Sequence, residues 1–527
     1  MIKMKARSGF AKSGVYESND LNFTFPGIVN IASKTAIKSE LKLIREDGKL
    51  YLNGILLDEK EIKRNRYIEF YEDLVIVPNL STILKKHKEF VKYVIDLRKE
   101  IGVKKIIFAP FIGIPSQIPV LMYLGIDLID TSYTYLASKN GYLFTRYGAF
   151  REEGKVDDNL NLMAEYMQET RDAINRNKLR DLVESLPDLT AKSLLRITDL
   201  FYYKEIEPFY PVWEKELNAV QYDSLFRADI KRFIERVNER YHKPALYNTL
   251  LLLPCSAKKP YSDSKSHRFF RNLIEDTGKM VHEVIVTSPP AVVPRELETV
   301  YPAQNYDISV IGYWYQDEVK LIREQLKRYI ENNRYEHIIA YLPEDLEFVR
   351  DVLESYGAKI IIGNLRDAEN IKTLKDYILS SNSPAISRKY QIKEEIKAVI
   401  RYQFGDSFDN ILERLTITGR YPNIDILLDN EHFMHFNRDK GMVTLSLKAA
   451  EILVDKRRYS VTIENFEPKG TVFAVGVLDA TEDIRKEDEI AIIIDGKAVG
   501  TGTAKMNYAD LRSQDYGEAI KIRAFKK

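Results

Sequence analysis

The densest group of reactive side chains lies at residues 254–267, which read Pro-Cys-Ser-Ala-Lys-Lys-Pro-Tyr-Ser-Asp-Ser-Lys-Ser-His. It contains Cys255, the single cysteine among 527 residues. A thiol attacks as the thiolate, and cations such as Lys258, Lys259 or a protonated His267 would lower its pKa. The segment therefore fits an activated nucleophile, although a lone cysteine after an apolar run also fits a small buried side chain.

Two further polar segments lie close by in the sequence. Residues 288–298 read Ser-Pro-Pro-Ala-Val-Val-Pro-Arg-Glu-Leu-Glu, a proline-stiffened loop. We expect it to hold Arg295 and Glu296 where they can grip an amine, a carboxylate or a phosphate. An interpretation of equal weight is that both residues only begin a helix and form pairs with neighbouring side chains. Residues 301–307 then add polar groups, including Asp307.

Apolar runs that alternate with helical stretches must position these segments. The expected strands are 246–253, 280–287, 307–311, 337–342 and 359–362, and the expected helices between them are 317–330 and 344–356. This rhythm predicts an open parallel sheet, whose ligand sites lie beyond the carboxyl ends of its strands. Cys255 is thereby expected at the carboxyl end of a buried strand, with both polar loops on the same side.

The rest of the chain predicts an α/β protein of several domains. Strands are expected at 74–78, 106–111 and 126–129, helices at 83–100 and 118–124, and a mostly helical stretch at 157–209. After a Ser/Asn/Pro stretch at 380–387, a helix at 392–404 and strands near 424–428 indicate a small α+β unit. Strand-like runs at 461–463, 472–478 and 490–494 indicate a small β-barrel. The expected domains are 1–205, 206–380, 381–440 and 441–527.

Composition excludes several classes of protein. The 79 Lys and Arg nearly balance the 78 Asp and Glu, so any RNA binding must come from local patches. One cysteine excludes a disulfide scaffold and a zinc site built from several cysteines, and we expect no metal. Since no signal-peptide core and no run of about 18 apolar residues is found, we expect a cytoplasmic protein without a membrane span.

The spacing within residues 254–267 resembles the motif of the archaeosine synthase family: Pro-Cys, three residues, Lys-Pro-Tyr, two residues, Ser, two residues, His. In this chain the motif falls on Pro254, Cys255, Lys259, Pro260, Tyr261, Ser264 and His267. With seven positions in a fixed fourteen-residue frame, the match is specific.

Members of that family are paralogues of archaeal tRNA-guanine transglycosylase. Residues 125–130 and 140–148 resemble the barrel strand that carries the transglycosylase nucleophile and the loop after it, which places Asp130 at the nucleophile position. The Asp-Ser-Gly-Gly-Phe-Gln segment that supplies the transglycosylase base is not found, nor is a cysteine cluster for its zinc. At about 200 residues, this half is also short for a barrel of ~250. It is expected to be a degenerate transglycosylase-like (β/α) barrel that has lost base exchange.

The end of the chain resembles a PUA domain, an RNA-binding β-barrel. Residues 440–450 match its opening and residues 498–504 its Gly-rich later strand, while Glu487 and Asp488 stand where Gly-Asp is usual. Phosphate contacts from such a domain position tRNA without reading its sequence. The candidate tRNA-binding residues are Lys456, Arg457, Arg458, Arg485 and Lys486. Taken alone, each of these basic clusters is more often a solvated turn.

The resemblance implies an addition to the nitrile of 7-cyano-7-deazaguanine at position 15, in the D-loop of tRNA. The donor would be the amine of free lysine, or glutamine or ammonia, and the product an amidine. Cys255 would attack the nitrile carbon, His267 or a water would protonate the nitrogen, and Lys259 would hold the thiolate or a tRNA phosphate. The candidate substrate-binding residues are Tyr261, Ser264, Ser288, Arg295, Glu296 and Asp307. No cofactor is implied, and a radical-SAM partner enzyme and a homodimer are left open.

Two other functions compete with this one. The first is an active tRNA-guanine transglycosylase with Asp130 as nucleophile, against which the missing base segment argues. The second is a non-catalytic protein that presents tRNA to a partner enzyme, against which the reactive segment around Cys255 argues.

Overall fold

The computed structural model describes residues 1–18, 22–30, 41–46, 49–52, 55–56, 60–62, 67–71, 73–78, 80–152, 155–308, 312–420 and 422–526. The chain divides into two compact units. Unit 1 comprises Met1–Pro211, Val461–Lys486 and Thr503–Ile522, and unit 2 comprises Val212–Ser460, Glu487–Gly502 and Arg523–Lys527. Within the described ranges, no helix is long and apolar enough to cross a membrane.

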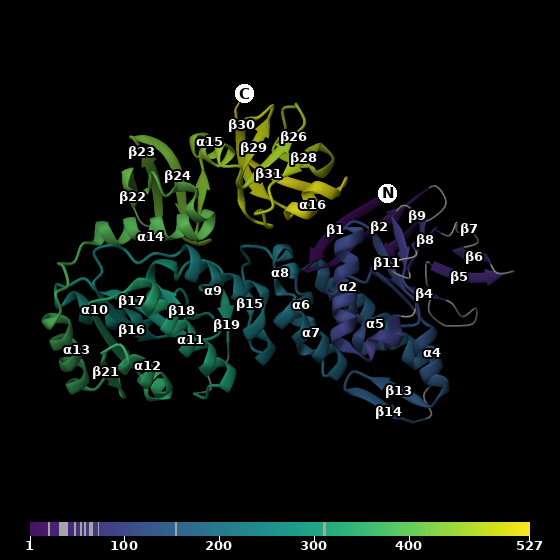
Figure 1. Ribbon diagram of the computed structural model, residues 1–527, viewed down its shortest axis with the longest axis horizontal. Coiled ribbons are helices and arrows are strands. Elements are labelled where there is room, and N and C mark those ends of the chain that lie inside the picture. Colours follow the sequence, from purple (N-terminus) through teal and green to yellow (C-terminus); the bar gives the residue numbers. More distant parts are fainter. Residues whose placement is uncertain are drawn as a thin grey trace. The chain divides into compact units, whose positions relative to one another are not determined.

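The main sheet of unit 1 has the strand order β7-β6-β5-β4-β12-β11-β10-β9-β8 (Figure 1). Its centre is parallel and consists of β10 (Leu74–Ile76), β11 (Ile106–Ala109), β12 (Leu128–Asp130), β4 (Gly27–Asn30) and β5 (Leu41–Glu46). Antiparallel strands flank it: β6 (Lys49–Leu52), β7 (Ile55–Leu56), β8 (Lys60–Ile62) and β9 (Tyr67–Tyr71). The apolar runs expected at 74–78, 106–111 and 126–129 thus lie in three adjacent parallel strands.

Smaller elements complete the first part of unit 1. An antiparallel sheet contains β1 (Ile2–Ser8), β2 (Ala11–Glu17) and β3 (Asn22–Phe25), and a hairpin contains β13 (Tyr142–Thr145) and β14 (Gly148–Arg151). The helices are α1 (Leu80–Leu84), α2 (His87–Ile101), α3 (Ile118–Tyr123), α4 (Ser132–Lys139), α5 (Val156–Asn175), α6 (Leu179–Ser185), α7 (Leu189–Phe201) and α8 (Tyr203–Ile206). The mostly helical stretch expected at 157–209 is confirmed, whereas the single helix expected at 83–100 is two helices.

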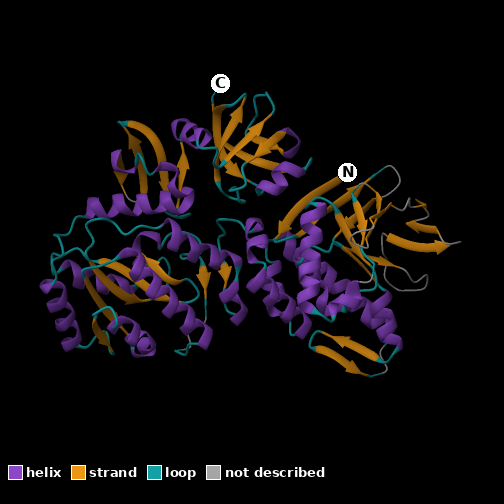
Figure 2. Cartoon of the chain, viewed as in Figure 1, coloured by secondary structure: helices purple, strands orange, loops and turns teal. Residues whose placement is uncertain are grey.

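The central sheet of unit 2 has the order β18-β17-β16-β20-β21. Figure 2 shows its strands in orange with purple helices around them. The strands β16 (Thr249–Pro254), β17 (His282–Thr287), β20 (His337–Leu342) and β21 (Lys359–Ile362) are parallel, as predicted. Of the strand expected at 307–311, Asp307 lies in β19 (Tyr306–Asp307), which pairs with β15 (Leu217–Asn218) in a separate sheet and not in the central one. Residues 309–311 lie outside the described ranges. The remaining strand is β18 (Ala291–Pro294), which runs antiparallel to β17.

Both faces of this sheet are covered. In β16, Leu250 and Leu252 belong to one buried cluster, whereas Leu251 and Leu253 belong to another. Successive side chains of a strand point to opposite faces, which is why the strand is a continuous apolar run. The helices of this part are α9 (Ala228–Arg240), α10 (Lys265–Glu275), α11 (Gln316–Asn333), α12 (Arg350–Glu354) and α13 (Ala368–Ser380).

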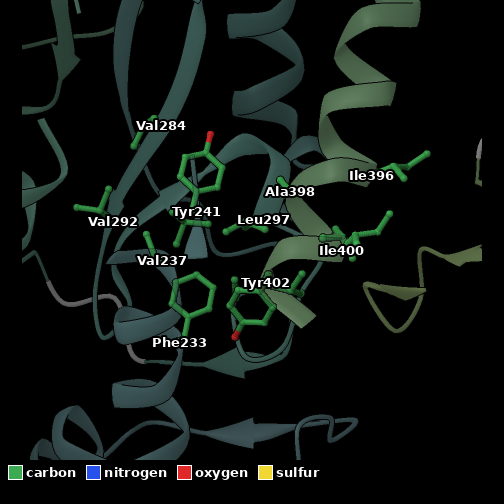
Figure 3. Close-up of a cluster of buried hydrophobic side chains, with 14 of the residues drawn as sticks. Phe233, Val237, Tyr241, Val284, Val292, Leu297, Ile396, Ala398, Ile400 and Tyr402 are labelled. Atoms are coloured by element: carbon green, nitrogen blue, oxygen red, sulfur yellow. The ribbon is translucent and has the colours of Figure 1, made fainter. Parts of the chain in front are cut away.

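A long helix, α14 (Arg388–Phe404), joins the central sheet to the next part of unit 2. Its side chains Ile400 and Tyr402 lie in one apolar cluster with Phe233 of α9 and Leu297 (Figure 3). A four-stranded antiparallel sheet follows, with β22 (Leu415–Arg420), β23 (Asn423–Leu428), β24 (Glu431–Asn437), β25 (Met442–Leu445) and then α15 (Leu447–Asp455). Because β25 pairs with β24, the segment expected to open the PUA domain belongs instead to this sheet.

The C-terminal strands form a six-stranded sheet in the order β27-β31-β30-β29-β26-β28. Its elements are β26 (Ser460–Ile463), β27 (Thr471–Phe473), β28 (Val477–Ala480), β29 (Glu489–Ile494), β30 (Lys497–Ala504), α16 (Tyr508–Ser513) and β31 (Glu518–Phe525). The runs expected at 461–463 and 490–494 lie in β26 and β29, whereas the run expected at 472–478 is divided between β27 and β28 by a 3-10 turn at Ala474–Gly476.

Candidate active site at the carboxyl end of β16

Cys255 lies directly after β16, at the carboxyl edge of the central sheet, and is partly buried. The end of the neighbouring strand β17 supplies Thr287, whose side chain hydrogen-bonds the thiol and lowers its pKa. The Thr287 hydroxyl lies 2.7 Å from the hydroxyl of Tyr306, which lies 2.8 Å from that of buried Tyr261. A chain of three hydroxyl groups therefore ends at the sulfur atom.

Burial dominates the ionisation of Cys255. It raises the pKa of the thiol above its ordinary value, and Asp345 adds to that effect, while Thr287 and Lys259 act in the opposite direction. The expectation that neighbouring cations leave the thiol with a low pKa is therefore wrong for the free protein, because desolvation of the thiolate outweighs their attraction. At rest the thiol keeps its proton near neutral pH.

Lys259 is the cation nearest this chemistry. Its ammonium group lies 3.9 Å from the ring centroid of Tyr306, and burial lowers its pKa while Cys255 and Asp307 raise it. A lysine in such surroundings exchanges its proton more readily than one in water. Lys258, by contrast, is exposed.

His267 is buried and bonded at both ring nitrogens. Its Nδ1 lies 2.8 Å from Nη2 of Arg295, and its Nε2 lies 3.0 Å from the carbonyl oxygen of Pro254. A guanidinium group can only donate, so Nδ1 accepts and Nε2 carries the proton. Burial and then Arg295 lower the pKa of His267 to about 3. The expected proton donor is therefore a neutral ring that fixes the backbone before Cys255.

Arg295 and Glu296 do not join Cys255. Because β18 reverses direction after β17, pairing Pro294 with Val284, both residues return toward the amino end of the sheet. Arg295 pairs with Glu298 at 2.7 Å and with Glu283 at 2.5 Å. These buried ion pairs replace the expected grip on substrate.

Glu296 is likewise occupied by its neighbours. Its Oε2 lies 3.0 Å from the hydroxyl of Tyr241 and 3.0 Å from Nε2 of His282. Its pKa is lowered despite burial, through His282 and the hydrogen bond from Tyr241. Since His282 begins β17, this carboxylate lies at the opposite end of the strand from Thr287.

The remaining candidate site residues fall into two groups, those near the thiol and those away from it. Ser264 caps α10 by accepting the backbone N–H of His267 at 3.1 Å, a structural role. Asp307 is exposed and acts electrostatically on Lys259. Ser288 donates to Glu318 at 2.6 Å, beside the end of β17. The structure thus gathers Lys259, Tyr261 and Asp307 near the thiol and keeps Ser264 away from it.

Three neighbours of the thiol were missing from the predicted site. They are Thr287, Tyr306 and Asp345. Thr287 ends β17, and Asp345 follows β20 by three residues, so both obey the rule that ligand sites lie beyond carboxyl ends of strands. That rule alone could have selected them.

Asp130 ends β12 in unit 1 and is buried. Its carboxylate accepts the backbone N–H groups of Phe111 at 3.0 Å and Ser132 at 2.9 Å, and burial raises its pKa. The residue sits at the end of a parallel strand, where the resemblance to transglycosylases places it. Among the described residues, no group of three or more His, Cys, Asp and Glu is arranged to hold a metal ion.

The basic candidates differ in exposure. Lys456 and Arg457, which follow α15, are exposed. Arg485 is instead paired with Glu207 at 2.8 Å, with its side chain 15% exposed, and is poorly suited to meet a phosphate. Lys486 is half-buried.

Family comparisons cover three consecutive segments. Residues 230–378 match a domain of unknown function, DUF5591, and residues 394–459 match the patch-forming domain C2 of tRNA-guanine transglycosylase. Residues 463–526 match the PUA domain. Lys456, Arg457 and Arg458 therefore fall in the C2 match and outside the PUA match.

The archaeosine synthase subunit alpha of Thermoplasma acidophilum is 34% identical over 86% of this chain and 88% of its own length. The chain belongs to the archaeosine synthase family. The subunit alpha of Methanosarcina acetivorans is 31% identical over 90% of this chain and 82% of that protein. A tRNA-guanine(15) transglycosylase of Methanocaldococcus jannaschii is 22% identical over 92% of this chain and 76% of that protein. Membership makes this chain a tRNA-modifying transferase of archaeosine biosynthesis, as the motif around Cys255 predicts.

Proposed function

We propose that this chain adds an amino-acid amine to the nitrile of 7-cyano-7-deazaguanine at position 15 of tRNA, with Cys255 as the nucleophile. The observation that carries the proposal is the placement of the family motif: its cysteine directly follows the central parallel strand β16, and both Thr287 and Lys259 lower the pKa of its thiol. That edge of an open α/β sheet is where ligands bind.

In the first step the sulfur of Cys255 attacks the nitrile carbon. A carbon–sulfur bond forms, one electron pair of the triple bond moves to nitrogen, and the nitrogen takes up a proton to give a thioimidate. The thiol proton leaves to water and the nitrogen takes up its proton from water, while the ammonium group of Lys259, whose charge lowers the pKa of the thiol, stays beside the sulfur. Thr287 donates a hydrogen bond to the sulfur while it is negative.

In the second step the donor amine attacks the same carbon. The carbon–sulfur bond breaks, the thiolate leaves, and an amidine remains on the base. Thiolate is a good leaving group, and Lys259 stabilises it by charge until the thiol is protonated again. The donor we favour is free lysine, with glutamine or ammonia as the alternatives.

The remaining domains would hold the tRNA. We assign residues 1–205 to a degenerate transglycosylase-like barrel, on the parallel strands β10, β11, β12, β4 and β5 and on the position of Asp130. The C2 and PUA matches supply RNA-facing surface, with Lys456 and Arg457 as exposed cations. The target base must leave its stack before a pocket can reach it.

The test is mass spectrometry of nucleosides from tRNA that carries 7-cyano-7-deazaguanine, incubated with the protein and lysine, glutamine or ammonia in turn. We expect an amidine with one donor and none with Cys255→Ala. Without donor, wild-type protein and this tRNA should form a covalent adduct that Cys255→Ala lacks. Near-normal turnover by Cys255→Ala would instead show that the amine attacks directly, and unmodified tRNA in every reaction would favour a tRNA-presenting protein.

A further inference from the structure

A cavity in unit 2 has no part in the mechanism above. Its volume is about 210 Å³. Aromatic rings form much of its wall: Tyr222 and Tyr315 lie 5.7 Å apart, and Tyr315 and Tyr313 lie 5.9 Å apart, each pair edge to face. Tyr313 is 68% exposed and Tyr315 48% exposed, so their ring faces are open to a ligand.

The cavity adjoins the surroundings of Cys255 through two short stretches of chain. Its wall includes Pro289, two residues beyond Thr287, and Ile308, two residues beyond Tyr306. Thr287 bonds the thiol, and Tyr306 bonds Thr287. A flat ligand in this cavity would therefore contact chain segments that continue directly from the two residues beside the sulfur.

One buried charge faces the cavity. Glu318, 7% exposed, accepts the hydroxyl of Ser288 at 2.6 Å on Oε1 and the backbone N–H of Tyr315 at 2.8 Å on Oε2. A carboxylate has about four acceptor positions, so each oxygen retains one for a ligand. The two existing bonds fix the orientation of the group.

We propose that this cavity receives the extruded 7-deazaguanine base, with the tyrosines as its stacking surface and Glu318 as the acceptor for its N1–H and 2-amino groups. The inference rests on the proposed function and names the recognition half of the same site. The two N–H groups of the guanine Watson–Crick edge match the two oxygens of a carboxylate. The nitrile projects from the five-membered ring, away from the 2-amino group, and stays available to Cys255.

The cavity suits a base better than the donor amino acid. A free amino acid needs a cation for its carboxylate, and none of the described residues that line this cavity is a cation. Bases, in contrast, gain roughly 1–3 kcal/mol each from stacking on aromatic side chains.

The experiment compares two full-length tRNAs that differ at position 15 only, one with 7-cyano-7-deazaguanine and one with 7-cyano-7-deazahypoxanthine, which lacks the 2-amino group. Single-turnover amidine formation is measured with the full-length protein. We expect the wild type to prefer the amino-bearing base by about ten-fold or more, the usual discrimination of a bidentate contact. Glu318→Gln should lose most of this preference by slowing the reaction of the amino-bearing tRNA.

Matched variants separate recognition from folding. Glu324→Gln, on the same helix but exposed and paired with Lys320, should keep the preference. Tyr313→Ala should weaken binding of the modified tRNA by about ten-fold, whereas Tyr313→Phe, which keeps the ring, should not.

The outcomes distinguish this inference from the function on which it rests. Amidine formation with an unchanged base preference in Glu318→Gln would place the base elsewhere and leave the proposed function standing. Absence of amidine from the wild type on either tRNA would overturn both.

Discussion

The neighbours of Cys255 have opposing effects on the pKa of its thiol. Burial and Asp345 raise its pKa, and Thr287 and Lys259 lower it, with burial the largest effect. A protonated thiol is a poor nucleophile, so the reactive fraction depends on pH and on the neighbouring lysine.

We therefore predict that donor-free adduct formation accelerates by about ten-fold per pH unit between pH 6 and 8, as the thiolate fraction grows. Lys259→Met should slow it at every pH in this range, since the cation that stabilises the thiolate is lost. Single-turnover rates from gel-resolved adduct measure both effects. A rate independent of pH would contradict the ionisation assigned to Cys255.

His267 predicts a separate pH effect, on stability. Its pKa lies at about 3 in the folded protein against 6.5 when unperturbed, so the folded state prefers the neutral ring. This contribution is complete above pH 6.5 and is lost as the pH falls toward 3. Between pH 7 and 5 the melting temperature of the wild type should therefore fall more than that of His267→Gln. Equal slopes in thermal scans would show that the ring is not held neutral.

At the scale of elements, the reversal from β17 into β18 decides which residues reach the thiol. It leaves Thr287 at the carboxyl edge and carries Arg295 and Glu296 back toward the other end. Arg295 nevertheless touches the site indirectly, because it fixes the ring of His267, which holds the carbonyl of Pro254. The β17–β18 hairpin therefore acts by positioning other residues of the site and not by contacting the substrate.

The sequence predicted the parallel strands β16, β17, β20 and β21 because each is an apolar run that ends at a turn signal. It failed at residues 288–298, since Ser-Pro-Pro indicates a turn but not the direction in which the chain continues after that turn. The site shows the same division: Cys255 and Lys259 follow from local order, whereas Tyr306 reaches the thiol only through tertiary folding. His267 was misassigned because its partner Arg295 lies 28 residues away.

A glutamate of helix α14 predicts a second effect of pH on stability. Glu395 lies in a cavity with Glu298, and burial, then Glu298 and Glu296, raise its pKa to about 8 from 4.5. The folded state thus favours the protonated acid, and stability falls as the pH rises from 4.5 through 8. Glu395→Gln should stabilise the protein at pH 8, by at least ~1 kcal/mol, and have little effect at pH 4.5. Chemical unfolding at both pH values measures the difference, and destabilisation at pH 8 would contradict it.

At the scale of the whole molecule, tRNA binding should depend on the exposed cations after α15. Replacing Lys456 and Arg457 by Glu should weaken binding of whole tRNA by roughly ten-fold or more and reduce the salt slope by about 1 to 2. Arg485→Ala serves as the comparison: it breaks the pair with Glu207, so it should lower the melting temperature with little change in the salt slope. Binding titrations at several salt concentrations would contradict this assignment if the two variants behaved alike.

The other large unit carries a negative prediction. Labelled guanine should not enter tRNA, because the segment that supplies the transglycosylase base is not found. Asp130→Asn should then keep amidine formation within about three-fold, since a neutral amide oxygen still accepts the N–H groups of Phe111 and Ser132. Incorporation of label above background would show that base exchange persists.

The protonated resting state of Cys255 also bears on the durability of the enzyme. Peroxide and alkylating agents attack thiolates, so a sulfur that keeps its proton until substrate arrives escapes most adventitious oxidation. The protein has no second cysteine, so an oxidised Cys255 cannot be protected by a reversible intramolecular disulfide. Protection of Cys255 from oxidation therefore comes from its desolvated position after β16. A nitrile-bearing analogue of the base should label Cys255 far more selectively than iodoacetamide does.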